Sequence, residues 1–426
     1  MANRREGATQ AGSGDAGSGG QVWPSRFSWS VFLAVAGPGL VAMLADTDAG
    51  SVVTVAQSGA QWGYRLLLSN LLFIPFMFFA QELALRIGLG TRQGAIELVR
   101  RRFGRGPALA LLAVLAASCF GALVSELAGL AGAGQAIGAP VEATMALAFV
   151  GLMAMVVTGS YRSVERVALF FGLFEIAFVA MAWRAAPGWR PIAVEVLRAP
   201  PRDPEFFTLL AANLGTSVIP WALLYQQSAT IHKGLGPSHL PAARIETLIG
   251  VVVCQAITSA LLIAAGATLS AHGALDSIAD IETAFTATLG GAFGHVVFVL
   301  GLAGSALTAT IVVCLTLAWS VGEAFGVSRS LDHSPAQAPW FYGAMALLLA
   351  VGGALVASGA NLVSLSIAAG VANAVLLPVV LGFLYFLARV ALPEPLRLRG
   401  PYAAATAFAF LTVAAVGVGS AIAGWL

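Results

Sequence analysis

The segment VFLAVAGPGLVAMLADTDAGSVVTVAQSGA, residues 31–60, decides how the whole chain is interpreted. It is apolar and long enough to cross a bilayer, which takes about 20 residues in a helix. Asp46 and Asp48 nevertheless lie near its centre and are its only charged residues. A carboxylate at the middle of a bilayer is energetically costly unless it is neutralised or paired. The two aspartates therefore indicate a functional site inside the membrane.

The composition is that of a membrane protein with many spans. Of the 426 residues, 58% are hydrophobic and 10% are charged, whereas a soluble protein has about 25% charged residues. The net charge is only +2, and the basic residues are scattered between apolar runs, so no nucleic-acid partner is expected. Cys119, Cys254 and Cys314 lie inside apolar runs without CxxC spacing, which predicts neither a disulfide nor a zinc site.

Apolar runs of about 18 residues or more predict membrane spans. Eleven such runs lie near residues 31–60, 66–88, 107–134, 142–160, 165–184, 206–231, 245–270, 292–325, 339–358, 363–389 and 402–424. Lys and Arg favour cytoplasmic loops, and with a cytoplasmic N-terminus all but five of the 22 basic residues lie inside. The sequence thus predicts a multi-pass plasma-membrane protein with its N-terminus in the cytoplasm and its C-terminus outside.

Two of these spans carry helix-breaking residues at mid-membrane. The first contains Gly37-Pro38-Gly39 and, after the aspartates, Ala49-Gly50-Ser51; the sixth contains AANLGTSVIPWALLYQQSA, residues 211–229. Either break alone is compatible with a simple proline or glycine kink. Two breaks five spans apart are typical of an inverted-repeat transporter with its site at the midplane.

This interpretation divides the chain into a tail and a transporter domain. Residues 1–28 are rich in Gly, Ala and Ser and predict a disordered cytoplasmic tail. The transmembrane domain, 29–426, would comprise two inverted five-helix repeats, 29–185 and 206–390, and an extra helix at 400–424.

The side chains at and after the two breaks are oxygen donors. They are Asp46, Thr47, Asp48, Ser51, Thr216, Ser217, Tyr225, Gln226 and Gln227. Donors of this hard type suit Mg²⁺, Ca²⁺ or Mn²⁺ better than copper, zinc or iron. The alternative is that one aspartate is protonated and only hydrogen-bonds the broken helix. Glu126 in the third span is a further candidate, as a proton site or an outer partner of the metal, and Glu175 and Asn373 are weaker ones.

No catalytic motif accompanies these residues. The sequence has no HExxH, GxSxG or P-loop pattern, which argues against an intramembrane protease, a serine hydrolase and an ATP-driven pump. We therefore expect neither enzymatic activity nor a cofactor, and a metal ion enters only as the transported substrate.

The first span resembles that of the NRAMP divalent metal transporters. That family has GPG, then DPGN, then a QxGxQxGY tail, and GPGLVAMLADTDAGSVVTVAQSGAQWGY follows the same register. The resemblance extends through QELALRIG and SELAGLAGAG to most of the membrane domain. It implies the LeuT-type fold and places Asp48 on the family's metal-binding aspartate and Ser51 on its asparagine. We expect the protein to be monomeric.

The sixth span departs from the family pattern. Where the family has alanine, then methionine, then Pro-His, this chain has Thr216, Ile219, Pro220 and Trp221. In the third span the family's Asp and Glu become Glu126 and Gly129. The soft thioether and the histidine associated with proton release are thus absent. This combination resembles the NRAMP-related magnesium transporters.

Four functions remain open on these grounds. The first is a Mg²⁺ and Mn²⁺ uptake carrier that works by alternating access without obligatory proton coupling. The second is a proton-coupled Mn²⁺ or Fe²⁺ transporter in which Glu126 accepts the proton. The third is a sodium-coupled carrier of small organic substrates, and the fourth is a membrane scaffold or sensor. We therefore expect the metal site to contain Asp48, Ser51, Asp46, Thr216, Ile219, Gln227, Tyr225 and Glu126.

Overall fold

The structure is a computed structural model that describes residues 29–158, 160–270, 273–327 and 333–425. The predicted tail, 1–28, lies outside the described residues. Within them the regular elements are all helices. Ten helices are long and apolar enough to span a membrane, and the bent pair α2–α3 makes an eleventh span. The prediction of eleven spans is confirmed.

The spans follow one another along the chain as single or interrupted helices. They are α2 (Pro38–Asp46) with α3 (Ala49–Trp62), α4 (Leu67–Thr91), α6 (Arg105–Ala136), α7 (Val141–Thr158), α8 (Tyr161–Gly172) with η1 (Leu173–Glu175) and α9 (Ile176–Ala185), α11 (Pro204–Ser217) with α12 (Pro220–His232), α13 (Leu240–Thr268), α15 (Gly291–Phe325), α16 (Pro339–Ala357), α17 (Leu362–Val390) and α18 (Gly400–Ala423).

Four shorter helices lie between the spans or before the first one. They are α1 (Trp29–Val35), α5 (Ala95–Phe103), α10 (Trp189–Val196) and α14 (Ile278–Leu289). α5, α10 and α14 fall between the predicted spans because they are too short to form long apolar runs, whereas α1 covers the start of the predicted first span, 31–60. The remaining short elements are the 3₁₀ turns η2 (Pro237–His239) and η3 (Glu394–Leu396).

The first and sixth spans are interrupted where the sequence predicts it. Between α2 and α3 the chain bends by 43°, and Asp48 is extended and caps α3 by accepting the N–H of Ser51 at 2.6 Å. In the sixth span the extended residue Ile219 precedes Pro220, the first residue of α12. Proline fits this position because the first N–H of a helix has no partner within it.

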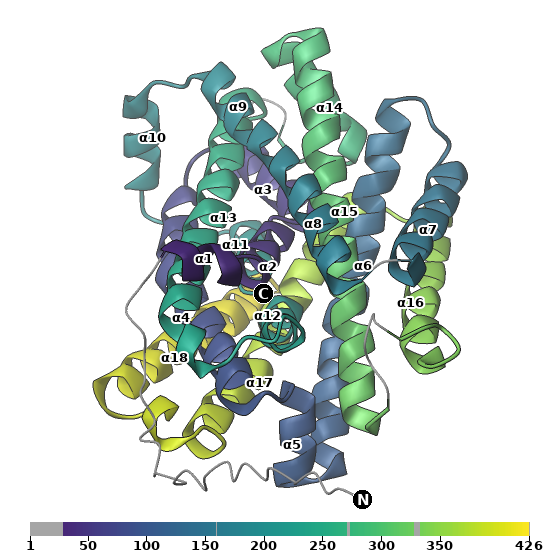
Figure 1. Cartoon of the computed structure of the whole chain (residues 1–426). Coiled ribbons are helices and arrows are strands. Elements are labelled where there is room, and N and C mark those ends of the chain that lie inside the picture. The colour runs from purple at the N-terminus through teal and green to yellow at the C-terminus, as the bar shows by residue number, and fades with distance from the viewer. Residues whose placement is uncertain (1–28, 159, 271–272, 328–332, 426) are drawn as a thin grey trace, which may run out of the picture.

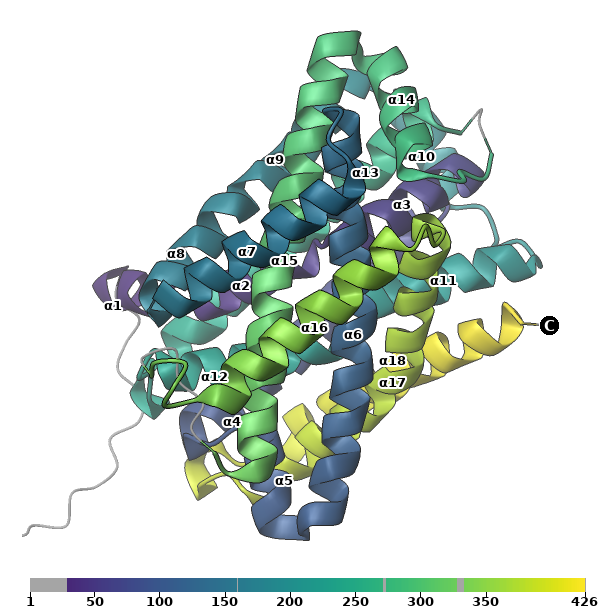
Figure 2. The same cartoon turned by 90° about the vertical axis from the view of Figure 1, so that its right-hand side faces the viewer.

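The two interrupted spans lie near the middle of the molecule (Figures 1 and 2), and α6, α13, α15 and α17 pack around them. Glycines permit the closest approaches. A Cβ at Gly129 of α6 would lie 2.4 Å from the Cβ of Ala49, and a Cβ at Gly215 of α11 would lie 1.9 Å from the carbonyl oxygen of Gly370. Close backbone contact through small residues is typical of helices packed in a membrane.

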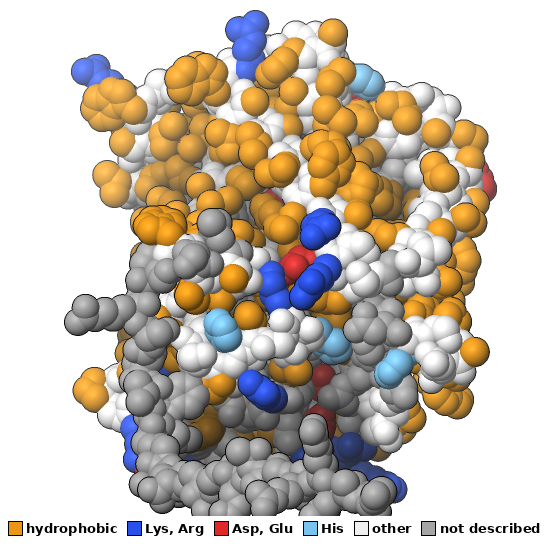
Figure 3. All heavy atoms as spheres, viewed as in Figure 1, with side chains coloured by type: hydrophobic (Ala, Val, Ile, Leu, Met, Phe, Trp, Pro, Cys, Tyr) orange, Lys and Arg blue, Asp and Glu red, His pale blue; other side chains and the backbone are white. Residues whose placement is uncertain are grey.

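The outer surface is largely apolar, as a lipid-facing surface must be. Large side chains such as Leu147, Phe408 and Leu411 are exposed, and hydrophobic atoms cover most of the upper half of the face shown in Figure 3. Near the middle of that face, basic side chains gather around an acidic one. Polar groups within the spans are otherwise mainly buried, which leaves the interior as the place for a polar site.

Candidate metal centre

The Ser51 hydroxyl joins the two interrupted spans. Its oxygen lies 3.0 Å from the carbonyl oxygen of Asp46 and 3.1 Å from the carbonyl oxygen of Thr216, and it can donate its single proton to either. The last residues of α2 and α11 thus direct main-chain oxygens toward the same point. Helix breaks make this possible because the final carbonyls of a helix have no partner within it.

Asp48 lies beside this point, on the first turn of α3. Its side chain is buried and accepts the N–H of Ser51. Glu126 of α6 reaches the same turn, where its Oε2 accepts the N–H of Ala49 at 2.9 Å and its Oε1 has no hydrogen-bond partner among the described residues. Glu126 therefore contacts the residue that directly follows the predicted metal ligand.

Asp46 ends α2 and is directed away from Asp48, toward α13. Its Oδ2 lies 4.0 Å from the Sγ of Cys254, which also accepts the hydroxyl of Thr47 at 3.4 Å. Its Oδ1 has no hydrogen-bond partner among the described residues. Residues two apart thus face different neighbours across the break. Cys254, for which the sequence predicts neither a disulfide nor a zinc site, lies next to Asp46.

Thr216 and Ile219 lie on either side of the break in the sixth span, and both are buried. Thr216 contributes its carbonyl oxygen to the contact with Ser51, while its hydroxyl donates to the carbonyl of Asn213 at 3.2 Å. Ile219 is the extended residue that precedes α12. A metal could thus meet Thr216 through its main chain, whereas Ile219 offers no polar side-chain atom.

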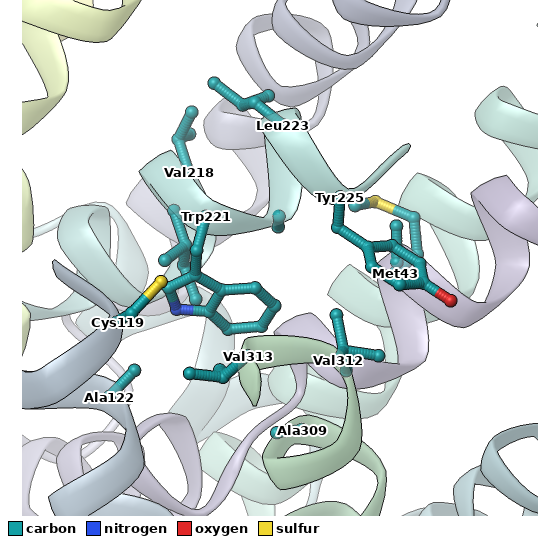
Figure 4. Packing of buried hydrophobic residues seen from close by; sticks show 14 of the residues in the cluster. Met43, Cys119, Ala122, Val218, Trp221, Leu223, Tyr225, Ala309, Val312 and Val313 are labelled. Carbon is teal, nitrogen blue, oxygen red and sulfur yellow. The ribbon is translucent and has the colours of Figure 1, made fainter. Parts of the chain in front are cut away.

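Trp221 occupies the position at which the resemblance leads one to expect histidine. Its side chain is fully buried and lies among Cys119 and Ala122 of α6 and Val313 of α15 (Figure 4). The indole therefore fills an apolar space with a group that does not titrate. A proton cannot be held at this position as it could be on an imidazole.

Tyr225 and Gln227 make their contacts away from Asp48. Tyr225 stacks on Trp319 with ring centroids 5.7 Å apart. Gln227 donates its Nε2 to the carbonyl of Gln93 at 2.9 Å, between α4 and α5. Both residues remain predictions as ligands, because their side chains lie beside other partners in this conformation.

The start of α2 is fixed by a carboxylate that the sequence analysis did not single out. Oε1 of Glu246, on α13, accepts the N–H groups of Gly37 at 2.7 Å and of Gly39 and Leu40 at 3.0 Å each. A negative group at a helix N-terminus is stabilising. The signal available in the sequence was an acid within an apolar run, but its partner could not be inferred.

Lys233, the single lysine of the chain, contacts Ala36, the residue just before the Gly-Pro-Gly turn at the start of α2. Its Nζ donates to the carbonyl of Ala36 at 2.6 Å and pairs with Glu165 of α8 at 3.0 Å. Gly37 has φ +149, and a Cβ there would lie 1.9 Å from Oε1 of Glu165. Gly37 is thus required by the close approach of Glu165 and Lys233, and a Cβ at Gly39 would lie 3.1 Å from the carboxyl group of Glu246.

Taken together, the polar groups at the centre suit a hard cation. The carboxylate of Asp48, the hydroxyl of Ser51 and the carbonyl oxygens of Asp46 and Thr216 lie around one point. Across the described ranges, no three His, Cys, Asp or Glu side chains converge closely enough to hold a metal by themselves. A cation here would therefore depend on main-chain oxygens and water, which Mg²⁺ and Mn²⁺ accept.

The sequence of this chain is similar to a known family and to several named proteins. A sequence profile described as natural resistance-associated macrophage protein-like matches residues 39–423. The divalent metal cation transporter MntH of Verminephrobacter eiseniae is 29% identical over 309 residues, which cover 66% of this chain and 67% of that protein. MntH of Acidiphilium cryptum is 26% identical over 308 residues, covering 67% and 69%.

Solved structures share the architecture. A histidine-to-alanine mutant of the Eremococcus coleocola manganese transporter superposes with a TM-score of 0.78 at 15% identity, covering 95% of this chain and 90% of that one. Mhp1, a nucleobase-cation-symport-1 family transporter in a closed conformation, gives a TM-score of 0.55 at 16% identity, covering 91% and 90%.

Eleven spans with interrupted first and sixth helices, and the similarity to these solved structures, define a multi-pass membrane protein of the LeuT-type fold. The chain belongs to the NRAMP family. Its relatives are named as transporters, so the prediction that it is not an enzyme is confirmed. The family assignment made from the first span is confirmed as well.

Proposed function

We propose that this protein carries divalent metal ions, Mg²⁺ and Mn²⁺, across the plasma membrane by alternating access, without obligatory proton coupling. The observation that carries the proposal is the contact of the Ser51 hydroxyl with the carbonyl oxygens of Asp46 and Thr216 beside the Asp48 carboxylate. It offers oxygen ligands from both interrupted spans. The relatives are named divalent metal cation and manganese transporters, which supports the class of substrate.

The donor set favours hard ions. Ile219 stands at the position of the family's methionine, so the contacts around Ser51 include no thioether. Cys254 Sγ lies near Asp46 and Thr47 rather than at Ser51. Mg²⁺ keeps part of its water shell in most protein sites, and an incomplete ring of protein oxygens leaves room for such water.

The surroundings of the site favour transport without coupling to protons. Trp221 is buried among apolar side chains, and Gly129 approaches Ala49 where the family has an acid. The membrane potential can drive accumulation by itself. Two charges that cross roughly 100 mV gain about 4.6 kcal/mol, which corresponds to a gradient of more than about a thousandfold.

One observation favours the proton-coupled alternative, transport of Mn²⁺ or Fe²⁺ together with protons. Glu126 is a buried carboxyl group whose Oε2 accepts the N–H of Ala49, next to Asp48, and whose Oε1 has no hydrogen-bond partner among the described residues. In this alternative, metal binding to Asp48 would release a proton from Glu126. Coupling depends on whether the proton then crosses the membrane with the metal or returns to the side from which the metal came.

The deciding experiment is uptake into proteoliposomes with an imposed potential and a pH dye inside. The proposal predicts that Mg²⁺ and Mn²⁺ enter, that Asp48→Ala abolishes entry, and that the lumen does not acidify. Acidification in proportion to metal entry would establish the proton-coupled alternative. Robust Fe²⁺ or Cd²⁺ flux without Mg²⁺ flux would contradict the argument from hard ligands.

The orientation and assembly state belong to the same proposal. We assign the N-terminus to the cytoplasm because 17 of the 22 basic residues then lie on that side. The functional unit is taken as a monomer because both interrupted spans that form the site belong to one chain.

A further inference from the structure

A second buried acidic group lies beside the metal centre and is not used by the mechanism above. Glu175 ends η1, the short turn between α8 and α9 in the fifth span, and its relative exposure is 0%. Neither of its carboxylate oxygens has a hydrogen-bond partner among the described residues. A buried carboxylate without donors is strongly unfavourable, so this group requires an explanation.

The packing of α8 against α2 places Glu175 at the break in the first span. Gly172 lies against Leu44, since a Cβ on Gly172 would be 2.7 Å from that side chain. One turn further along each helix, Glu175 faces the hydroxyl of Thr47. That hydroxyl has a single proton, which it donates to Cys254 Sγ at 3.4 Å. No donor lies within hydrogen-bond distance of either carboxylate oxygen of Glu175 among the described residues, so its carboxylate lies at the break without a partner.

Asp46 meets the same neighbours from the other side. Its Oδ2 lies 4.0 Å from Cys254 Sγ, and its Oδ1 has no partner among the described residues. Three buried carboxylate oxygens, one from Asp46 and two from Glu175, thus lack hydrogen-bond donors around Thr47 and Cys254. Asp48 and Asp46, which are both acids, act electrostatically on Glu175. Only a cation or bound protons can offset this accumulation of negative charge.

We propose that Asp46, Glu175 and the Thr47 hydroxyl form a second position for the transported divalent cation, next to the position at Asp48. The inference rests on the proposed function. Two carboxylates and one hydroxyl supply part of the six ligands of Mg²⁺ or Mn²⁺, and water completes the shell. The position therefore holds a partly hydrated ion, which reaches Asp48 by moving across the break between α2 and α3.

This second position has a defined place in transport. Asp46 ends α2 and Asp48 begins the turn into α3, so an ion that moves from one to the other passes along the main chain of Thr47. Two divalent ions do not occupy both positions at the same time, because like charges repel strongly in a buried site. One ion occupies them in turn, and Glu175 lowers the cost of dehydration before the ion reaches Asp48.

The test uses the full-length protein in nanodiscs and Mn²⁺ alone as the probe, with binding measured by calorimetry and by the Mn²⁺ electron paramagnetic resonance signal. In Asp48→Ala, a weaker Mn²⁺ site should remain. Adding Glu175→Gln should weaken the remaining site by roughly tenfold or more, the effect typical of losing a metal-supporting group. Adding Glu142→Gln, which removes one charge from the first turn of α7, should leave it unchanged.

Each result decides one of the two proposals. Equal residual affinity in Asp48→Ala with and without Glu175→Gln, or no residual site in Asp48→Ala, overturns the second position. Wild-type affinity in Asp48→Ala instead overturns Asp48 as the main ligand, and the Glu175→Gln comparison still decides the second position. Glu175→Gln keeps the side-chain volume, and its thermal unfolding without metal verifies that the variant is folded. The single variant should also raise the KM for Mn²⁺ uptake more than it lowers kcat.

Discussion

Glu246 offers a direct test of how the first span is held in this conformation. Its Oε1 accepts three main-chain N–H groups, from Gly37, Gly39 and Leu40. Glu246→Gln preserves the size of the side chain and one acceptor oxygen but removes the charge. Hydrogen bonds to a charged group contribute about 1.5–3 kcal/mol, compared with about 0.5–1.5 kcal/mol for neutral ones. Because the three donors share one oxygen, we expect a total loss of about 2 kcal/mol.

The loss should appear as faster amide exchange at the start of α2. Hydrogen–deuterium exchange measures the free energy of local opening, and about 1.4 kcal/mol changes the open population tenfold. A loss of about 2 kcal/mol therefore predicts roughly 30-fold faster exchange of the amides of Gly37, Gly39 and Leu40. Mass spectrometry of a peptide that covers this turn provides the measurement, in detergent and without metal.

The matched control is Glu82→Gln. Glu82 is also a buried acid, but it pairs with Arg86 and Arg244 and accepts the hydroxyl of Tyr402 at 2.7 Å. It makes no hydrogen bond to α2 among the described contacts, so exchange at 37–40 should not change. Equal exchange in Glu246→Gln and the unsubstituted protein would refute the reasoning that the charge of Glu246 holds this turn. Equal acceleration by both variants would show a general loss of stability instead.

Three further changes test other contacts. Ser51→Ala removes the hydroxyl that joins the two spans and should weaken Mn²⁺ binding by roughly tenfold in calorimetry, whereas unchanged affinity would remove Ser51 from the site. Gly215→Ala places a Cβ 1.9 Å from a main-chain oxygen of α17 and should lower the free energy of unfolding by at least about 2 kcal/mol in a denaturation assay. Gly343→Ala, with nothing within 4 Å, is its neutral control. Lys233→Met removes the cation that pairs with α8, so kcat for Mn²⁺ uptake should fall without a change in KM, and a selective rise in KM would contradict this placement.

The interruptions in the first and sixth spans could be predicted because their causes are local. Asp48 is a good N-cap and is followed by Ser51, whose N–H it accepts, and Pro220 can begin a helix but not continue one. The spacing of the two breaks along the chain then indicated the class of fold. These features depend on a few neighbouring residues, so the sequence alone contains the information.

The partners within the site could not be predicted in the same way. Periodicity places Tyr225 and Gln227 shortly after the break, but helix rotation directs them toward Trp319 and Gln93. Conversely, Glu246 lies in an apolar run with nothing in its sequence neighbourhood that points to α2. Contacts between segments about 200 residues apart are determined by tertiary packing, which residue spacing does not encode.

The consequence of a substitution is also difficult to predict from the sequence, as Gly129 shows. Gly129 stands where the family has an acidic residue, and from the sequence this difference suggests only that one proton-carrying group is missing. The structure shows that its missing side chain admits Ala49, because a Cβ would lie 2.4 Å from the Cβ of that residue. The start of α3 can thus approach α6 closely enough for Glu126 to accept the N–H of Ala49.

The central claim, that a divalent ion binds between the two interrupted spans, is tested most directly by locating Mn²⁺ by its anomalous scattering in crystals of the full-length protein. We predict that the strongest peak lies within ligand distance of the Asp48 carboxylate, next to Ser51 and the carbonyl of Thr216, and that it disappears in Asp48→Ala. A strongest peak away from both breaks, or one that persists at the same place in Asp48→Ala, would contradict the account.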